Sequence, residues 1–194
     1  MPQKNGDPSA VPESVTVLLE RHRDGQPEAM DELANLLYPE LKAMARRRAS
    51  SRPGGSATTL VQETFLKLLS GGDLVAEDRQ QFFGLVATVM RQIIVDEVRY
   101  ITAAKRKRQD VTLTEAILGD DSHEKAAFLL EVDDVLDKLA REDERLVRVF
   151  ECRYFAGFTM AETAEALGTS ERTAERLWSA ARSRLSTLLA PQAS

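Results

Sequence analysis

Hydrophobic residues recur at intervals of three and four along most of this 194-residue chain, which is the spacing of amphipathic helices. Ser14 can cap a first short helix, and Asp24-Gly25 ends it. A second helix starts near Pro27 and runs to about Arg48, and Pro39 inside it predicts two pieces or a bend. The apolar positions of this second helix are Met30, Leu33, Leu37, Leu41 and Met44.

Two further helices are predicted before residue 109. Thr59 and Gln62 predict a capping box at the start of TTLVQETFLKLLSGG, and Gly71-Gly72 ends that helix. Residues 78–104 then form one long helix with a basic end, Lys105-Arg106-Lys107-Arg108. The apolar stripe of the long helix consists of Phe82, Leu85, Val86, Val89, Met90, Ile93, Ile94 and Val98.

The periodicity also indicates how the chain is divided. Residues 1–13 contain three prolines and a glycine, which predicts a disordered N-terminal arm. Helical spacing is lost over residues 109–123, and we interpret this segment as a flexible linker. The prediction is therefore an all-α fold with two small helical domains, residues 14–108 and 124–190. The second domain opens on an amphipathic helix whose apolar residues are Leu129, Val132, Leu136 and Leu139.

Residues 144–188 read as three helices separated by tight breaks. Thr159 and Glu162 predict a capping box on a short helix, and Gly168 closes this helix in a turn that favours positive φ. Thr169 or Ser170 then caps the last helix. The small residues expected to face inward are Ala161, Ala164 and Ala174. This order of short helix, glycine turn and capped helix predicts a helix-turn-helix.

In a helix-turn-helix, the first residues of the second helix meet base edges in the major groove of DNA. Arg172 and Arg176 suit guanine edges, and Glu171 or Glu175 can accept from cytosine. Arg182 and Arg184 lie further along, where contact with phosphates is expected. The full set of predicted DNA-binding residues of this recognition helix is Ser170, Glu171, Arg172, Thr173, Glu175, Arg176 and Arg182.

Composition narrows the class of protein. Hydrophobic residues make up 43% of the chain and charged residues 29%, which is typical of a core-forming protein. The formal net charge of -5 excludes a uniformly basic protein that coats nucleic acid, but it allows local basic patches. Residues 115–151 hold twelve acidic and five basic side chains, which we interpret as a solvated helix face. The single cysteine, Cys152, excludes an internal disulfide, and we expect a structural, partly buried thiol.

Chemistry-bearing motifs are missing from the sequence. We find no Walker-type glycine loop, no nucleophile beside a base and no Glu-x-x-His pair. We therefore expect no enzyme activity, catalytic residue, metal, cofactor or small-molecule substrate. Because no apolar run is long enough to span a bilayer and the first residues lack a secretory apolar region, we expect a cytoplasmic protein without a membrane partner.

The chain resembles bacterial RNA polymerase sigma factors of the sigma-70 family, of the extracytoplasmic-function (ECF) type, in a divergent subgroup. FAGFTMAETAEALGTSERTAERLWSAARSRL is similar to the region that reads the −35 promoter element. TLVQETFLKL is similar to the helix that docks on core RNA polymerase, and FFGLVATVMRQIIVDEVRYITAAKRKR to the helix that recognises and melts the −10 element. The resemblance covers about residues 14–190. It departs from the usual family pattern at Thr59, Gln92 and Ala174.

The resemblance implies functional residues and partners. It places promoter DNA at the −10 element on Arg91, Gln92, Val95, Asp96, Arg99, Lys105 and Arg106. It places core RNA polymerase on Leu60, Gln62, Glu63, Phe65, Leu66 and Lys67. It also suggests an anti-sigma factor as a partner, although no residue in this sequence identifies one. The resemblance implies transcription initiation at specific promoters by a subunit that binds core polymerase.

Two other readings stay open at the level of sequence. The chain can be a stand-alone helix-turn-helix regulator, with residues 14–105 serving as a sensor or dimerisation domain. It can also be an enzyme built on a helical bundle. The basic-ended long helix and the TLVQETF run fit the regulator poorly, and the missing Glu-x-x-His pair argues against a metal-containing bundle.

Overall fold

The computed structural model describes residues 14–49, 56–70, 76–107 and 122–190. Within these ranges the chain forms helices and no strand, so the predicted all-α class is confirmed. The helices are α1 (Val15–Arg23), α2 (Glu28–Ala49), α3 (Ala57–Ser70), α4 (Arg79–Lys107), α6 (Ser122–Ala140), α7 (Glu144–Phe150), a π-helical turn η1 (Glu151–Phe155), α8 (Met160–Ala166) and α9 (Glu171–Leu189). The predicted arm, the glycine pair at 71–72 and all but the last two residues of the predicted linker lie outside the described residues.

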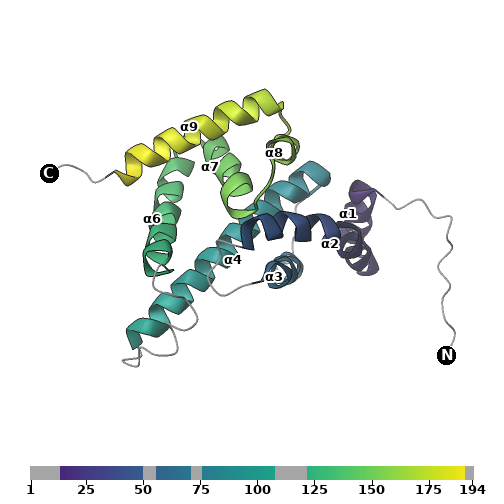
Figure 1. Ribbon diagram of the computed structural model, residues 1–194. Helices are drawn as coiled ribbons and strands as arrows, with labels where there is room; N and C mark the ends of the chain where they lie inside the picture. The colour runs from purple at the N-terminus through teal and green to yellow at the C-terminus, as the bar shows by residue number, and fades with distance from the viewer. Residues whose placement is uncertain (1–13, 50–55, 71–75, 108–121, 191–194) are drawn as a thin grey trace.

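Helix α4 is the longest described helix and lies between two groups of helices (Figure 1). Helix α3 packs against it from the N-terminal group, while α6, η1 and α8 pack against it from the C-terminal group. Buried side chains of both groups form one continuous hydrophobic core. Phe82 and Met90 of α4, Leu33 and Leu41 of α2, and Leu136 of α6 are all fully buried members of it. In this structure the two predicted domains are therefore in contact along α4.

Several predicted helix ends are confirmed by backbone geometry. The Ser14 side chain accepts from the backbone N–H of Val17 at 3.4 Å. Gly25 follows α1 with a φ of 81°, a left-handed conformation that suits glycine. Because a cap hydroxyl satisfies a backbone donor that has no partner within its helix, Ser14 stabilises the first turn of α1.

The N-terminal helices differ from the prediction at two places. Residues Glu28–Ala49 form a single helix with Pro39 inside it, so of the two predicted outcomes, two pieces or a bend, the two pieces do not occur. Pro39 is exposed, and α2 packs on both sides of it through Leu37 and Leu41. The predicted cap of α3 at Thr59 is wrong because the helix begins earlier, and the hydroxyl of Ser56 accepts from the backbone N–H of Thr59 at 3.1 Å.

The end of the predicted helix before Gly157 is a π-helical turn. Residues Glu151–Phe155 continue α7 with this wider geometry, and Gly157 follows with a φ of 73°. Cys152 within the turn is 1% exposed, as expected of a structural thiol. Burial, together with the neighbouring charge of Glu151, raises the pKa of Cys152 to about 12.

Candidate nucleic-acid interface

The helix-turn-helix forms as predicted from its capping signals. Thr159 and Glu162 make both hydrogen bonds of a capping box at the start of α8. Gly168 adopts a φ of 59° in the turn, and the Ser170 side chain accepts from the backbone N–H of Thr173 at the start of α9. Ser170, not Thr169, is therefore the cap of α9. These bonds fix where the second helix of the motif begins and hence which side chains stand at its N-terminal edge.

The inward face of the motif differs from the prediction at one position. Ala164 and Ala174 are buried as expected, but Ala161 is exposed. The buried positions of α8 are Thr163, Ala164 and Ala166, so the inward face is rotated from the predicted one. Thr163 tolerates burial because its hydroxyl donates to the backbone carbonyl of Thr159 at 2.7 Å.

The predicted DNA-reading residues line the outer edge of α9. Those that the structure leaves exposed are Ser170, Glu171, Arg172, Glu175, Arg176 and Arg182. Thr173 is half-buried and its hydroxyl contacts that of Ser170 at 3.0 Å. Trp178 packs inward on Phe150, with ring centroids 5.6 Å apart. The helix thus presents a charged edge to solvent while its aromatic residue holds it to the core.

The residues predicted for the −10 element are distributed around α4. Gln92, Asp96 and Arg99 are exposed, whereas Val95 is 2% exposed and belongs to the core. The Val95 side chain therefore offers no surface for DNA contact in this structure. Lys105 and Arg106 lie in the last turns of α4, and their side chains fall outside the described part of the structure.

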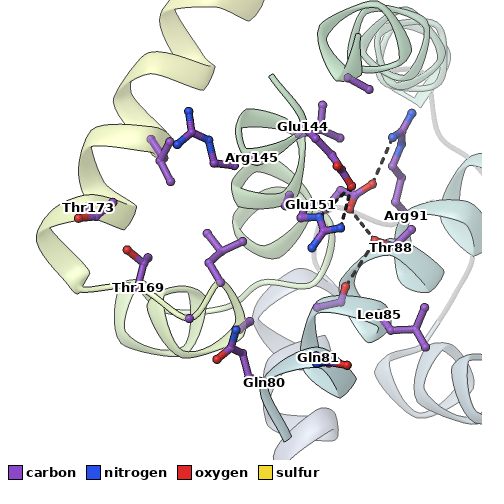
Figure 2. A pocket seen from close by; sticks show the side chains of 18 residues that line it. Gln80, Gln81, Leu85, Thr88, Arg91, Glu144, Arg145, Glu151, Thr169 and Thr173 are labelled. Carbon is purple, nitrogen blue, oxygen red and sulfur yellow. Dashed lines mark hydrogen bonds and ion pairs between the residues drawn. The ribbon is translucent and has the colours of Figure 1, made fainter. Parts of the chain in front are cut away.

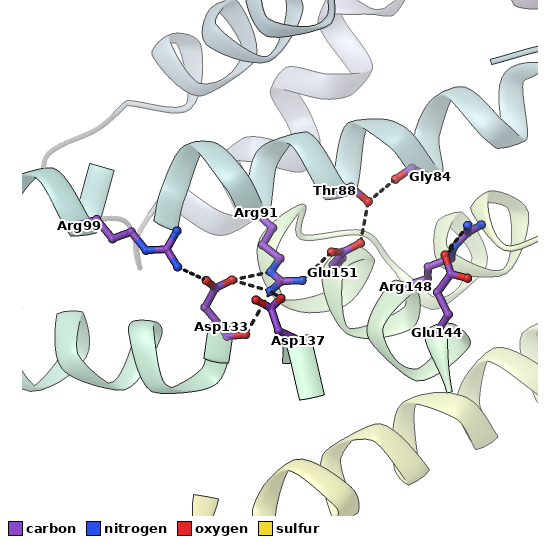
Figure 3. A network of polar contacts seen from close by, with 9 residues as sticks. All are labelled: Gly84, Thr88, Arg91, Arg99, Asp133, Asp137, Glu144, Arg148 and Glu151. Atoms are coloured by element: carbon purple, nitrogen blue, oxygen red, sulfur yellow. Dashed lines mark hydrogen bonds and ion pairs between the residues drawn. The ribbon is translucent and has the colours of Figure 1, made fainter. Parts of the chain in front are cut away.

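Arg91, also predicted to contact DNA, is held by carboxylates of the C-terminal helices (Figure 3). Its Nε donates to Asp133 Oδ1 at 2.7 Å, and its Nη2 donates to Asp137 Oδ1 at 2.7 Å. Nη1 donates to Glu151 Oε1 at 3.2 Å. Arg99 adds a bond to Asp133 Oδ2 at 2.8 Å. The interpretation of the acidic stretch as a solvated face is therefore wrong for Asp133 and Glu151, which are buried.

The pKa values of Arg91 and Glu151 are shifted by their surroundings. Burial disfavours the charged form of Arg91, but the hydrogen bonds from its guanidinium to Asp137, Asp133 and Glu151 outweigh this and raise the pKa of Arg91. Burial also raises the pKa of Glu151, and hydrogen bonds from Thr88 (2.7 Å) and Arg91 offset only part of the effect. The carboxylate of Glu151 therefore depends on α4 for the donors that stabilise it.

A second set of polar contacts joins the N-terminal helices to the helix-turn-helix. Arg47 of α2 donates through Nε to the carbonyl of Gly157 at 2.7 Å and forms an ion pair with Glu162. Arg79 at the start of α4 bonds Glu165 at 2.9 Å and also Glu40. The sequence did not indicate these pairings, because nothing in the helical spacing of α2 or α4 shows which distant carboxylate lies opposite.

Between these contacts lies a cavity of about 990 Å3 (Figure 2). Gln80 and Leu85 of α4 line one side, and Thr169 and Thr173 of the helix-turn-helix line the other. The two groups of helices thus share a hydrophobic core along α4 and leave this cavity between α4 and the helix-turn-helix.

The predicted polymerase-binding residues divide into core and surface. Leu60 and Phe65 are 2% and 8% exposed and belong to the hydrophobic core in this structure. Gln62 is exposed and Glu63 half-buried. The other members line a shallow groove of about 610 Å3 between α3 and α4. The groove is lined by Glu63, Leu66, Lys67, Ile93, Asp96, Glu97 and Tyr100.

Two apolar side chains stand out on this groove. Leu66 is 65% exposed and Tyr100 is 75% exposed, whereas most large hydrophobic residues of the described chain are buried. Lys67 bridges the two helices through Asp96 at 3.2 Å. Tyr100 was missed in the sequence, although its position seven residues after Ile93 places both on one face of a helix.

A family model described as "ECF sigma factor" matches residues 12–190, which is nearly the whole chain. The chain belongs to the ECF sigma factor family. This sigma factor therefore acts with RNA polymerase in transcription initiation, and the family binds core polymerase and promoter DNA without being an enzyme. No curated protein matches the chain. Among the described helices of the sigma factor, none combines the length and hydropathy needed to cross a membrane.

Proposed function

We propose that this sigma factor directs polymerase to promoters through three surfaces of the described structure. The outer edge of α9 reads the −35 element, the polar face of α4 reads the −10 element, and the groove between α3 and α4 docks on core polymerase. The observation that carries the proposal is the exposed, capped N-terminus of α9, because in a helix-turn-helix this edge enters the major groove.

At the −35 element, Arg172 and Arg176 are the residues expected to select bases. They lie one helical turn apart and both are exposed, so they can reach neighbouring base pairs from one edge of α9. A guanidinium can donate two bonds to O6 and N7 of guanine. Arg184 lies farther along and is paired with Glu142 at 2.8 Å, which favours a supporting role.

At the −10 element, the exposed polar residues of α4 are expected to hold separated strands. Gln92, Asp96 and Arg99 follow one another at spacings of four and three, so they share a side of the helix. Hydrogen bonds from such a face can capture unstacked bases, and binding energy then supports strand opening without nucleotide hydrolysis.

Core binding tests the docking groove. Leu66→Asp places a charge on its exposed apolar side chain, and Leu36→Asp is a matched control on α2, where Leu36 is 37% exposed. We expect the wild-type chain and the Leu36→Asp variant to bind sigma-free core polymerase one-to-one, and the Leu66→Asp variant to lose that binding. Equal binding by both variants would place the docking surface elsewhere. Absence of binding by the folded wild-type chain would favour the stand-alone regulator.

Promoter selection tests α9. Genomic fragments bound by the reconstituted holoenzyme would supply promoter sequences, and base substitutions in their −35 elements would then be compared across variants. Arg172→Ala or Arg176→Ala should cost about 1–3 kcal/mol of binding and relax selection at one base position. Arg184→Ala is the control, expected to weaken binding without changing the preferred base. A uniform loss from every variant would mean that Arg172 and Arg176 contact phosphates.

A further inference from the structure

The cavity between α4 and the helix-turn-helix has the size of a small-molecule site (Figure 2). Its volume of about 990 Å3 lies at the upper end of the range of about 300–1,000 Å3 that such sites span. Helices α4, α7 and α9 and the turn at Gly168 contribute to its lining. Arg172 and Arg176 lie outside this lining, and so does the Leu66 groove. The cavity is therefore separate from the surfaces proposed for bases and for polymerase.

Polar side chains on facing walls of the cavity have hydrogen-bonding groups available. The amide of Gln80 on α4 and the hydroxyl of Thr169 in the turn make no hydrogen bond within the described part of the chain (Figure 2). The side-chain oxygen of Gln81 accepts from the backbone N–H of Glu77 at 3.0 Å, which leaves the NH2 donors of Gln81 for a ligand. A ligand between the walls can therefore exchange hydrogen bonds with α4 and with the helix-turn-helix.

Apolar side chains lie among these polar groups. Leu85 of α4, Leu167 at the end of α8 and Leu177 of α9 are half-buried members of the lining. Part of each side chain therefore faces the open space of the cavity. A flat ring system would cover this apolar surface, and polar atoms at the edge of the ring would meet the amides of Gln80 and Gln81.

The α7 wall supplies positive charge. Arg145 and Arg148 line the cavity with side chains that are 74% and 60% exposed. Arg145 pairs with Asp143 at 2.9 Å, and Arg148 pairs with Glu144 at 2.7 Å. Because exposed pairs contribute little to stability, both guanidinium groups can turn to an anionic ligand at small cost. Arg91 adds no available charge, since carboxylates of α6 and η1 hold it. A phosphate suits these arginines because it accepts two parallel bonds from one guanidinium.

We propose that this cavity binds a nucleoside phosphate, with the base between Leu85 and Leu177 and the phosphates on Arg145 and Arg148. This ligand class combines a flat ring, hydrogen-bonding edges and an anionic tail, which are the three features that the lining can recognise. The ligand touches both groups of helices at once. Because it binds the folded chain and not the unfolded one, it stabilises the fold by mass action.

Titration of the full chain with ATP, GTP, CTP and UTP tests the site. Each nucleotide is added separately and followed by isothermal titration calorimetry, and the nucleosides and inorganic pyrophosphate serve as probes of the two halves of the ligand. We expect one-to-one binding of at least one nucleotide, with a higher midpoint of thermal unfolding. Its nucleoside and pyrophosphate should each bind about tenfold more weakly, because each makes only part of the contacts. Pyrophosphate binding as tight as nucleotide binding would overturn the proposal, as would the absence of saturable binding by all four nucleotides.

Charge variants on the α7 wall locate the site. Arg145→Gln and Arg148→Gln should each weaken nucleotide binding about tenfold, the effect of losing a charge-assisted hydrogen bond. Arg141→Gln is the matched control, because Arg141 is exposed in the turn before α7 and lies outside the lining. Glu144→Gln should instead tighten binding, since it removes a carboxylate that competes for Arg148. Equal losses from the control and from the wall variants would contradict the assignment, and so would a loss from Glu144→Gln.

A bulky side chain tests the cavity itself. Ala140 is exposed at the end of α6 and belongs to the lining, so Ala140→Trp fills part of the cavity without removing a buried contact. Ala43→Trp is the control on the exposed surface of α2. Far-UV circular dichroism verifies that both variants are folded. We expect Ala140→Trp to abolish nucleotide binding and Ala43→Trp to preserve it, while both variants bind core polymerase. Nucleotide binding that survives in folded Ala140→Trp would overturn the proposal, whereas a loss of core binding alone would count only against the docking surface.

Discussion

Glu151 is a buried acid whose charge depends on residues of another helix. Its native pKa is raised by burial, so the folded chain binds a proton that the unfolded chain has already released. Its contribution to the free energy of unfolding is therefore fully present below the unfolded pKa, about 4.3, and is lost as pH rises through the folded pKa. Thr88, Arg91 and Arg148 are the polar and charged groups that oppose this rise.

We predict that Glu151→Gln flattens the pH dependence of stability just above pH ~4.3, because it removes this titrating group. Urea unfolding at several pH values measures the effect, with the exposed Glu131→Gln as the control. Arg91→Met should raise the pKa of Glu151 further, which carbon NMR of the carboxyl would detect. A Glu151 pKa at or below the ordinary value in the wild-type chain would contradict the prediction.

Gly168 is constrained by its backbone and by its neighbour. It has a φ of 59°, and a Cβ there would collide with the Gln80 side chain. Gly168→Ala should therefore reduce the free energy of unfolding by about 1–2 kcal/mol, the cost of a left-handed conformation for a residue with a Cβ. Combining it with Gln80→Ala relieves the collision but not the backbone strain, so only part of the loss should return. Full recovery in the double variant would show that φ is not the cause.

At the scale of the helix, α3 offers a choice between two caps. The structure assigns the cap to Ser56 and the sequence favoured Thr59. We predict that Ser56→Ala lowers the free energy of unfolding by about 1 kcal/mol, the usual cost of a lost cap. Thr59→Ala should change it by less, since Thr59 supplies no cap bond to the backbone. Denaturant titrations compare the two variants, and a larger loss from Thr59→Ala would restore the sequence prediction.

Local signals explain which helices were predictable. The capping box at Thr159 and the single cap at Ser170 lie directly before strong apolar periodicity, so spacing and capping agree. At α3, a serine and two threonines precede the apolar run, and packing of Ala57 against the core extends the helix to Ser56. Pro39 is tolerated within α2 because tertiary packing outweighs one missing hydrogen bond. The cap of α3 and the continuity of α2 through Pro39 depend on tertiary contacts, which the spacing of apolar residues in the sequence does not show.

The residues of the candidate site also divide into those that the sequence could indicate and those that it could not. Exposure of the α9 edge follows from helical periodicity alone, so Arg172 and Arg176 could be picked out from the sequence. The pairing of Arg91 with Asp133 could not, because it joins residues 42 positions apart on different helices. A signal did exist: Asp133 stands four residues after Leu129, on the buried face of α6. A carboxylate in that position requires a partner.

At the scale of the whole molecule, the shared core predicts how the chain unfolds. Trp178 is the only tryptophan and reports on the C-terminal helices, whereas circular dichroism reports on every helix. We predict that both signals change at the same urea concentration in the wild-type chain, because the two groups of helices share α4. Divergent transitions in the wild-type chain would show that the groups already fold independently.

The reactivity of the buried Cys152 thiol can report how often the native fold opens. The thiolate is the species that reacts, and the pKa of the Cys152 thiol is about 12. Alkylating reagents therefore should not react with this sulfur while the fold is intact. Cysteines placed on the surface can thus be modified selectively without replacing the native one. When Cys152 does react, the rate of alkylation measures how often the interior around the π-helical turn is breached, and that frequency can be compared with and without DNA or polymerase.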